Sequence, residues 1–163
     1  EIDMELICTF RDVKRWATVT VDCPISYEEL KSRMGLNDSQ ELEYIVIDST
    51  NDLVGENDSL DLINKFAEMV EDVDDDLVLA VNEMLGYHAK EFVREGEDFF
   101  DKCILLPEVN SQRDLGHHYV DDIGISNLSK DTLESYFDYE AYGRDLDINN
   151  QGGFSSYGYL EVQ

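Results

Sequence analysis

Apolar and polar side chains alternate with a period of two in three stretches near the start of the chain, and these stretches are rich in β-branched and aromatic residues. This pattern predicts β-strands, because successive side chains of a strand point to opposite faces. The predicted strands cover residues 4–10, 16–22 and 43–48. A short helix is predicted over residues 27–34, where Ser26 is placed as N-cap and Glu29 follows at the spacing of a capping box. Gly35 is expected to end this helix.

From residue 58 the apolar positions recur every three or four residues instead, which is the spacing of one helix face. The first such set is Leu60, Ile63, Phe66, Ala67 and Val70. Two further helices are predicted over residues 75–85 and 87–95. Each is followed by a glycine that is expected to end it, Gly86 and Gly96.

Beyond residue 101 the pattern mixes strands and helices again. The predicted elements are strands over 102–106, 144–148 and 157–162, a turn over 149–153, and helices over 112–123 and from Ser129 to about residue 142. In the first of these helices, Leu115, Tyr119 and Ile123 are expected to face inward.

These elements predict an α+β protein of three small domains. They are an antiparallel sheet with a helix over residues 1–57, a helical bundle over 58–101, and an α+β domain with a small sheet over 102–163. Each domain is too short for a generous core of its own, so contact with a neighbouring domain or with another chain is expected.

The chain carries 38 Asp and Glu residues against 12 Lys and Arg residues, a formal net charge of −26 over 163 residues. Disordered acidic segments lack aromatic residues, whereas 42% of this chain is hydrophobic and 10% aromatic, so the charge decorates a folded body. On a compact sphere of this chain length the excess charge averages roughly one per 1.5 Å of diameter, against about one per 1.7 Å along duplex DNA. The surface therefore resembles DNA in its density of negative charge.

The acidic excess is graded along the chain. Residues 58–101 hold 14 acidic and three basic side chains, a net charge of −11, against −8 for residues 1–57 and −7 for residues 102–163. A uniform excess would instead indicate general solubility or adaptation to concentrated salt. Such a charge opposes direct binding to nucleic acid or to an anionic membrane, so the expected partners are basic.

No segment has the features of a membrane span or a secretory signal. The apolar runs 77–81 and 104–107 are far too short to cross a bilayer, and acidic residues stand near the start of the chain, where a signal peptide would be basic. Cys8, Cys23 and Cys103 are odd in number and widely spaced in apolar surroundings, which favours reduced core thiols. We therefore expect a cytoplasmic protein.

One acidic run has the spacing of a calcium-binding loop. Asp72, Asp74, Asp76 and Glu83 stand at its positions 1, 3, 5 and 12, but position 6, which needs glycine, is Leu77. The simpler interpretation is a helix N-terminus crowded with Asp, which the helix dipole favours.

Catalytic patterns are not found. His117 and His118 are adjacent, so on a helix they point about 100° apart and cannot share a metal ion, and His88 is isolated. No phosphate-binding glycine loop, nucleophile elbow or paired-cysteine motif occurs. We expect a protein that is not an enzyme and that needs no cofactor.

One segment, residues 133–148, closely resembles the antirestriction motif of the ArdA family. Its core is Phe137, Asp138, Tyr139, Glu140, Ala141, Tyr142, Gly143, Arg144, Asp145 and Leu146. Residues 27–30, 35–37 and 43–48 are similar to the first domain of that family. The resemblance implies an elongated, dimeric, three-domain protein that imitates bent B-form DNA and occupies the DNA groove of type I restriction-modification enzymes.

The resemblance also implies two sets of site residues. Carboxylates that would stand in for phosphates are Asp61, Glu68, Glu71, Asp72, Asp74, Asp75, Asp76, Glu83, Glu91, Glu95, Glu97, Asp98, Asp101, Asp114, Asp121 and Asp122. The motif, which would lie at or near the dimer contact, comprises the ten core residues with Tyr136 before them and Asp147 after them. Its aromatic cluster suits an interface, and Arg144 can neutralise one of the acids around it. The alternative is that this aromatic segment packs into its own domain.

The implied partners are the specificity and methylation subunits of a type I restriction-modification enzyme and a second copy of the chain, in the cytoplasm of a bacterial host. Two other functions stay open on the residues alone. They are an acidic adaptor or chaperone for a basic protein, and a calcium-binding module.

Overall fold

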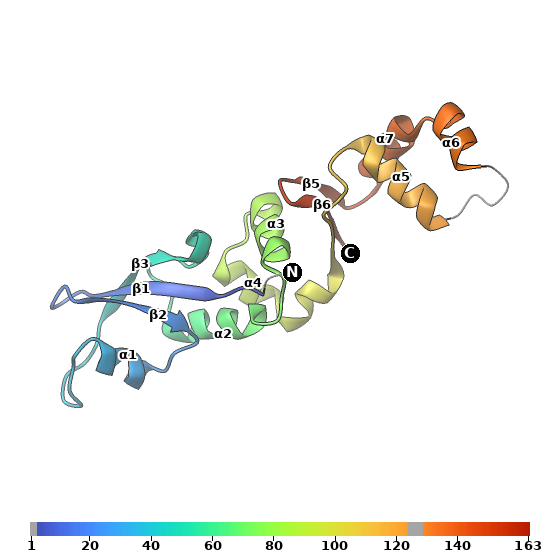
Figure 1. Ribbon diagram of the computed structural model, residues 1–163. Coiled ribbons are helices and arrows are strands. Elements are labelled where there is room, and N and C mark those ends of the chain that lie inside the picture. Colours follow the sequence, from blue (N-terminus) through green and yellow to red (C-terminus); the bar gives the residue numbers. More distant parts are fainter. Residues whose placement is uncertain (1–2, 124–128) are drawn as a thin grey trace. The chain divides into compact units, whose positions relative to one another are not determined.

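The computed structural model describes residues 3–123 and 129–163, and the chain divides into two compact units, Glu1–Phe100 (the first unit) and Asp101–Gln163 (the second unit) (Figure 1). The described residues combine helices with two three-stranded antiparallel sheets, one in each unit. The predicted α+β class is confirmed. The arrangement in three domains is not confirmed, and its boundaries stay a prediction.

The sheet of the first unit has the strand order β2-β1-β3. Its strands are β1 (Leu6–Asp12), β2 (Thr18–Cys23) and β3 (Tyr44–Ser49), so all three predicted strands form, displaced by one or two residues. Strand β1 buries Leu6, Cys8 and Phe10 on one face, as the alternating pattern requires.

Helix α1 (Tyr27–Arg33) begins and ends where the sequence predicts. The side chain of Ser26 accepts a hydrogen bond from the Glu29 N–H at 3.1 Å, and Gly35 adopts a φ of +80° just after the helix. The Glu29 carboxylate accepts from Arg33 at 3.1 Å instead of closing the capping box. Only half of that predicted motif therefore forms.

The next helices along the chain are α2 (Leu60–Val70), α3 (Asp75–Leu85) and α4 (Ala89–Glu95), with short 3-10 segments η1 (Thr50–Asp52) and η2 (Glu97–Lys102). Aromatic rings from α2, α4 and η2 pack on one another. Phe92 stacks on Phe66 at 5.4 Å and on Phe100 at 5.5 Å between ring centroids. The side-chain amide of Asn64 on α2 bonds both the N–H and the C=O of Ile25, which ties this helix to the segment after β2.

The described part of the second unit has the strand order β4-β6-β5 and three helices. The strands are β4 (Cys103–Leu106), β5 (Gly152–Ser155) and β6 (Gly158–Val162), and the helices are α5 (Gln112–Ile123), α6 (Lys130–Tyr136) and α7 (Tyr139–Asn149). Val109, Leu115 and Tyr159 form its buried core, with Tyr119 partly buried against them. The side chain of Ile123, predicted to face inward, lies outside the described residues.

Three predictions for the second unit are wrong. The turn predicted over 149–153 does not form there, because α7 includes Asn149 and β5 begins at Gly152, and the hairpin turn lies between Ser155 and Gly158. The helix from Ser129 does not continue to residue 142, because it ends at Tyr136 and a new helix, α7, begins behind the N-cap Asp138. The strand predicted over 144–148 is the second half of α7. Helix α7 instead packs on α5, and strand β6 takes β5 as its hairpin partner.

Candidate functional site

Most of the carboxylates that the sequence assigns to DNA mimicry, here called the mimic carboxylates, have exposed side chains. They lie on α2, α3, α4 and η2, on the segment between α2 and α3, and near the end of α5. The exposed members are Asp61, Glu68, Glu71, Asp72, Asp76, Glu83, Glu95, Glu97, Asp98, Asp101, Asp121 and Asp122.

The other four mimic carboxylates are half-buried, and three of them support local structure. Asp74 is the N-cap of α3 and accepts from the Asp76 N–H at 2.9 Å. Glu91 accepts from the His88 N–H at 3.0 Å, and this hydrogen bond lowers the pKa of Glu91. Asp114 accepts from the backbone of Asn110 at 3.1 Å, whereas Asp75 stands in the first turn of α3. These groups help to fix the helices that carry the exposed acids.

Amphipathic helices explain why so many acids face outward in the first unit. Helix α2 buries Ile63, Phe66 and Val70, so its acidic residues lie on the opposite side. Among these, Asp61 pairs with Lys65 at 3.0 Å on the surface.

Most of the neighbouring charge is not neutralised. Glu68, Glu71, Asp72 and Asp76 form no ion pair within residues 3–123 and 129–163. Acidic side chains also line a cavity of about 560 Å³ that adjoins Glu71, namely Asp3, Glu5 and Asp22. The result is a surface of concentrated negative potential.

The residues with the spacing of a calcium-binding loop do not form such a loop. Helix α3 begins at Asp75, so most of the proposed loop is helical, and Glu83 stands roughly 12 Å along the helix axis from Asp75. The carboxylates of Asp74, Asp75 and Asp76 lie within 4.8 Å of one another. This crowding is the acidic helix N-terminus that the sequence also predicts.

The antirestriction-like motif supplies the start and body of α7. Tyr139 is only 2% exposed, and its ring stacks on His117 of α5 at 3.7 Å between centroids. Phe137 meets the rings of Tyr139 and Tyr142 edge-on at 4.9 and 5.5 Å. Most of the aromatic cluster therefore packs within the second unit, whereas Tyr136 is 87% exposed. The motif's place at a dimer contact stays a prediction.

Side chains of α5 contact Glu134 on α6. Glu134 pairs with Arg113 at 2.9 Å and lies 3.3 Å from the Nε2 of His117. The Arg113 guanidinium also lies over the Tyr139 ring at 5.7 Å, and burial raises the pKa of that tyrosine. Arg144 is exposed and pairs with no described carboxylate, so the structure does not bring it together with the acids around it in sequence.

Two glycines permit the contact between α5 and α7. A Cβ atom on Gly143 would lie 1.7 Å from the carbonyl oxygen of Gln112, and one on Gly116 would lie 2.1 Å from that of Tyr139. Gly143 is thus a packing residue as well as a member of the motif. Sequence reasoning missed Gly116, although a glycine inside a helix is a signal of close packing.

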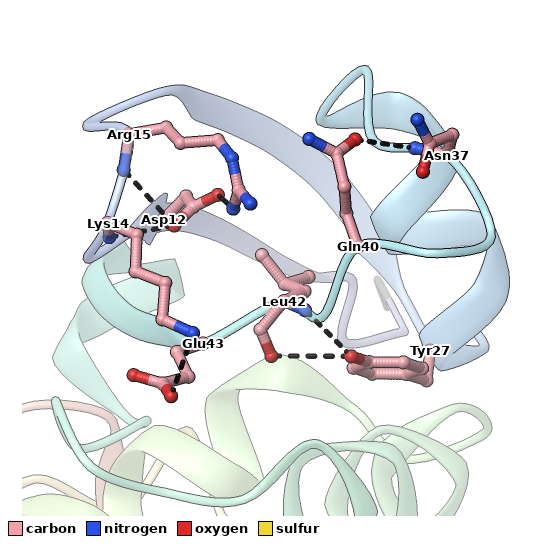
Figure 2. A network of polar contacts seen from close by, with 8 residues as sticks. All are labelled: Asp12, Lys14, Arg15, Tyr27, Asn37, Gln40, Leu42 and Glu43. Carbon is pink, nitrogen blue, oxygen red and sulfur yellow. Dashed lines mark hydrogen bonds and ion pairs between the residues drawn. The ribbon is translucent and has the colours of Figure 1, made fainter.

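The turn between β1 and β2 was also missed. Figure 2 shows the Asp12 carboxylate beneath this turn, where it accepts from the Lys14 and Arg15 N–H groups at 2.8 and 3.3 Å. The Arg15 guanidinium donates to the same carboxylate at 2.9 Å. Nearby, Lys14 pairs with Glu43 at 3.2 Å. An Asp that starts a turn and is followed by basic residues is a signal that could have identified this network.

Cys8 and Cys103 are buried, as predicted for core positions, whereas Cys23 is half-buried. None of the helices within residues 3–123 and 129–163 has the length and apolar character of a bilayer-crossing segment.

A model of the ArdA family, described as antirestriction protein, matches residues 14–161 of the 163-residue chain. No curated protein matches the chain.

Proposed function

The chain belongs to the ArdA family of antirestriction proteins, and from this membership we propose that it is a DNA mimic that occupies the DNA-binding groove of type I restriction-modification enzymes. Occupancy of the groove blocks cleavage of foreign DNA. It also excludes DNA from methylation wherever both reactions use the same groove. Its partners are the specificity and methylation subunits, and it acts as a homodimer.

The observation that carries this proposal is the set of exposed carboxylates without cationic partners. Glu68, Glu71, Asp72 and Asp76 are concentrated on α2, on the start of α3 and on the segment between them. A groove that binds DNA presents Lys and Arg to phosphates, and it can present them to carboxylates instead. Ions held by both surfaces are released on binding, which favours the complex.

Inhibition of this kind needs no reaction on the inhibitor, which fits a family of inhibitor proteins. It also needs no single essential side chain, because each carboxylate contributes a small part of the attraction.

The test is binding to a purified complex of specificity and methylation subunits. We expect duplex DNA to displace the protein, and we expect the affinity to fall by orders of magnitude between about 50 and 200 mM salt, as for DNA itself. The same DNA duplex, titrated alone, is the reference for the salt dependence. An affinity that stays flat over this range would rule out electrostatic mimicry. Binding that duplex DNA does not displace would favour an acidic adaptor.

A further inference from the structure

Trp16, the single tryptophan of the chain, lies in the β1–β2 turn and is 70% exposed. Its φ is +60°, in the left-handed region that glycine and asparagine adopt most readily. An indole at this place is therefore unfavourable for the backbone and leaves a large apolar surface in water. Neither the core nor the turn explains why tryptophan stands here, and strained, exposed residues of this kind are typical of binding sites.

Hydrogen bonds within the turn fix the backbone that carries Trp16. The Asp12 N–H donates to the Ala17 carbonyl and the Trp16 N–H to the Asp12 carbonyl, both at 2.8 Å. The buried Asp12 carboxylate adds the hydrogen bonds to Lys14 and Arg15 shown in Figure 2. In Figure 1 the turn between β1 and β2 lies at the end of the first unit that is remote from α2, α3 and α4, so it does not cover the mimic carboxylates on those helices.

Arg11 lies next to the Trp16 indole. Its guanidinium carbon lies 5.2 Å from the centroid of the Trp16 ring, within the range of a cation–π contact. In a chain with 38 carboxylates, Arg11 pairs with none of those described, and its buried Nε has no hydrogen-bond partner among them. Lys14 and Arg15 differ, because they pair with Glu43 and Asp12. Within residues 3–123 and 129–163, Arg11 is thus a cation beside this turn without a carboxylate partner.

We propose that Arg11 and Trp16 form a docking site for an acidic segment of a partner protein. A carboxylate of the partner binds the Arg11 guanidinium, and an apolar side chain beside it covers the Trp16 indole. Arginine and tryptophan are the residues that most often dominate the energy of protein interfaces. The inference rests on the proposed function, since the partner is the restriction-modification enzyme itself, bound at an acidic surface outside its basic groove.

Charge complementarity decides between a protein segment and a nucleic acid. A stacked base would also suit Trp16, but the phosphates of a strand would meet a chain of net charge −26. A protein segment can bring a single carboxylate, which the one positive charge of Arg11 matches, whereas a strand brings a phosphate with every nucleotide.

The docking site gives the protein a contact that DNA does not make. Screening by salt weakens the attraction between carboxylates and a basic groove, whereas the burial of an indole is not screened. The Trp16 contact therefore accounts for a larger share of the affinity at high salt than at low salt.

The first test uses protein labelled with 5-fluorotryptophan, which gives a single ¹⁹F resonance because the chain has one tryptophan. On addition of the unlabelled complex of specificity and methylation subunits, the resonance should shift and lose its dependence on the ratio of H₂O to D₂O. If the complex binds and duplex DNA displaces the protein, but Trp16 keeps its full solvent dependence, the docking site is wrong and the proposed function stands. If the complex does not bind at all, both fail.

The second test compares three variants at about 200 mM salt. Trp16→Asn keeps a residue that tolerates the positive φ, so the turn should stay folded, which circular dichroism checks. We expect Trp16→Asn and Arg11→Gln to weaken binding of the complex about tenfold each. Lys14→Gln removes the same charge from the same turn and should change binding less than about twofold. Equal losses in Arg11→Gln and Lys14→Gln, or a ¹⁹F shift on addition of a single-stranded oligonucleotide, would overturn the proposal.

Discussion

Asp12 differs from the mimic carboxylates in that its side chain is fully buried. Burial acts to raise its pKa, but hydrogen bonds from the Lys14 and Arg15 N–H groups and from the Arg15 guanidinium lower that pKa below its ordinary value of 3.8. The ionised form is thus the form that the folded turn stabilises.

Removal of this carboxylate should destabilise the first unit. We expect Asp12→Ala to lower the free energy of unfolding by about 1–3 kcal/mol, because the Lys14 and Arg15 N–H groups and the Arg15 guanidinium lose a charged acceptor. Denaturant unfolding measures the change. Asp22, exposed on β2, is the matched control, and Asp22→Ala should stay within about 0.5 kcal/mol of the parent protein. Equal effects of the two substitutions would contradict this role of Asp12.

The lowered pKa of Asp12 gives the pH dependence a definite sign. Its contribution to stability is fully present above its unfolded pKa, near 3.8, and is lost as pH falls through the lower pKa of the folded state. The difference in stability between the parent protein and Asp12→Asn should therefore be constant from pH 7 to pH 5 and shrink below about pH 4. Unfolding measured at several pH values checks this. A difference that shrinks as pH rises would contradict the assignment.

At the scale of elements, the contact between α5 and α7 depends on Gly143. An alanine inside an ordinary helix is more stable than glycine by about 0.5–1 kcal/mol. Here the added Cβ would collide with the Gln112 carbonyl, so Gly143→Ala should destabilise the second unit by about 1–3 kcal/mol. Asp145→Ala, at an exposed position of the same helix, is the control and should change stability by less than about 0.5 kcal/mol. A stabilised Gly143→Ala variant would show that the two helices do not touch there.

Local sequence signals were sufficient to predict where several helices begin and end. Helices α1 and α3 begin at polar caps and end at Gly35 and Gly86, and both ends depend on neighbouring residues alone. The alternation around Leu146 and Ile148 led to the wrong prediction of a strand, because five residues fit a strand or a helix face equally well. The segment forms a helix that packs closely on α5 at Gly116, a residue distant in sequence.

Some features of the candidate site could likewise be predicted from the sequence, and others could not. Exposure of the mimic carboxylates follows from the apolar stripe of their helices, so the pattern of α2 predicts it. The burial of Asp12 and the positive φ of Trp16 are set by the pairing of β1 with β2, in which Arg11 lies opposite Thr18. Pairing register is not visible in composition or spacing. For this reason the burial of Asp12 and the conformation of Trp16 could not be predicted, although an Asp followed by basic residues is a local signal of the turn itself.

At the scale of the whole molecule, a homodimer stays a prediction, and Tyr136 is the residue that best tests it. Tyr136 is 87% exposed on α6, whereas Tyr139 is buried, so replacing Tyr139 would disturb folding. We expect Tyr136→Ala to shift sedimentation toward the monomer if the motif anchors the dimer. Trp16→Asn removes an exposed aromatic side chain from the other unit and should leave the dimer intact. A dimer that survives Tyr136→Ala would place the interface elsewhere.

Charge sets the conditions for such a dimer. Two chains of −26 repel each other, so the dimer must gain from apolar burial more than it loses to repulsion. Lowering the salt concentration should therefore weaken it, because the repulsion is then less screened.

The central claim is that inhibition is distributed over many carboxylates, and the most direct measurement is inhibition of ATP-dependent cleavage by a type I enzyme across single and grouped substitutions. The grouped variant replaces four exposed acids by amides, Glu68→Gln, Glu71→Gln, Asp72→Asn and Asp76→Asn, and leaves the helix cap Asp74 in place. A control of equal charge replaces four exposed acids outside the mimic set, Glu28→Gln, Asp38→Asn, Glu41→Gln and Asp48→Asn.

Each single substitution should weaken inhibition less than about fivefold, because each acid contributes little at a partly solvated interface. The grouped variant should lose most of the inhibition while circular dichroism shows it folded, and the control should retain far more. One carboxylate whose amide replacement alone eliminates inhibition in a folded protein would contradict the account, as would a grouped variant that inhibits as well as the parent.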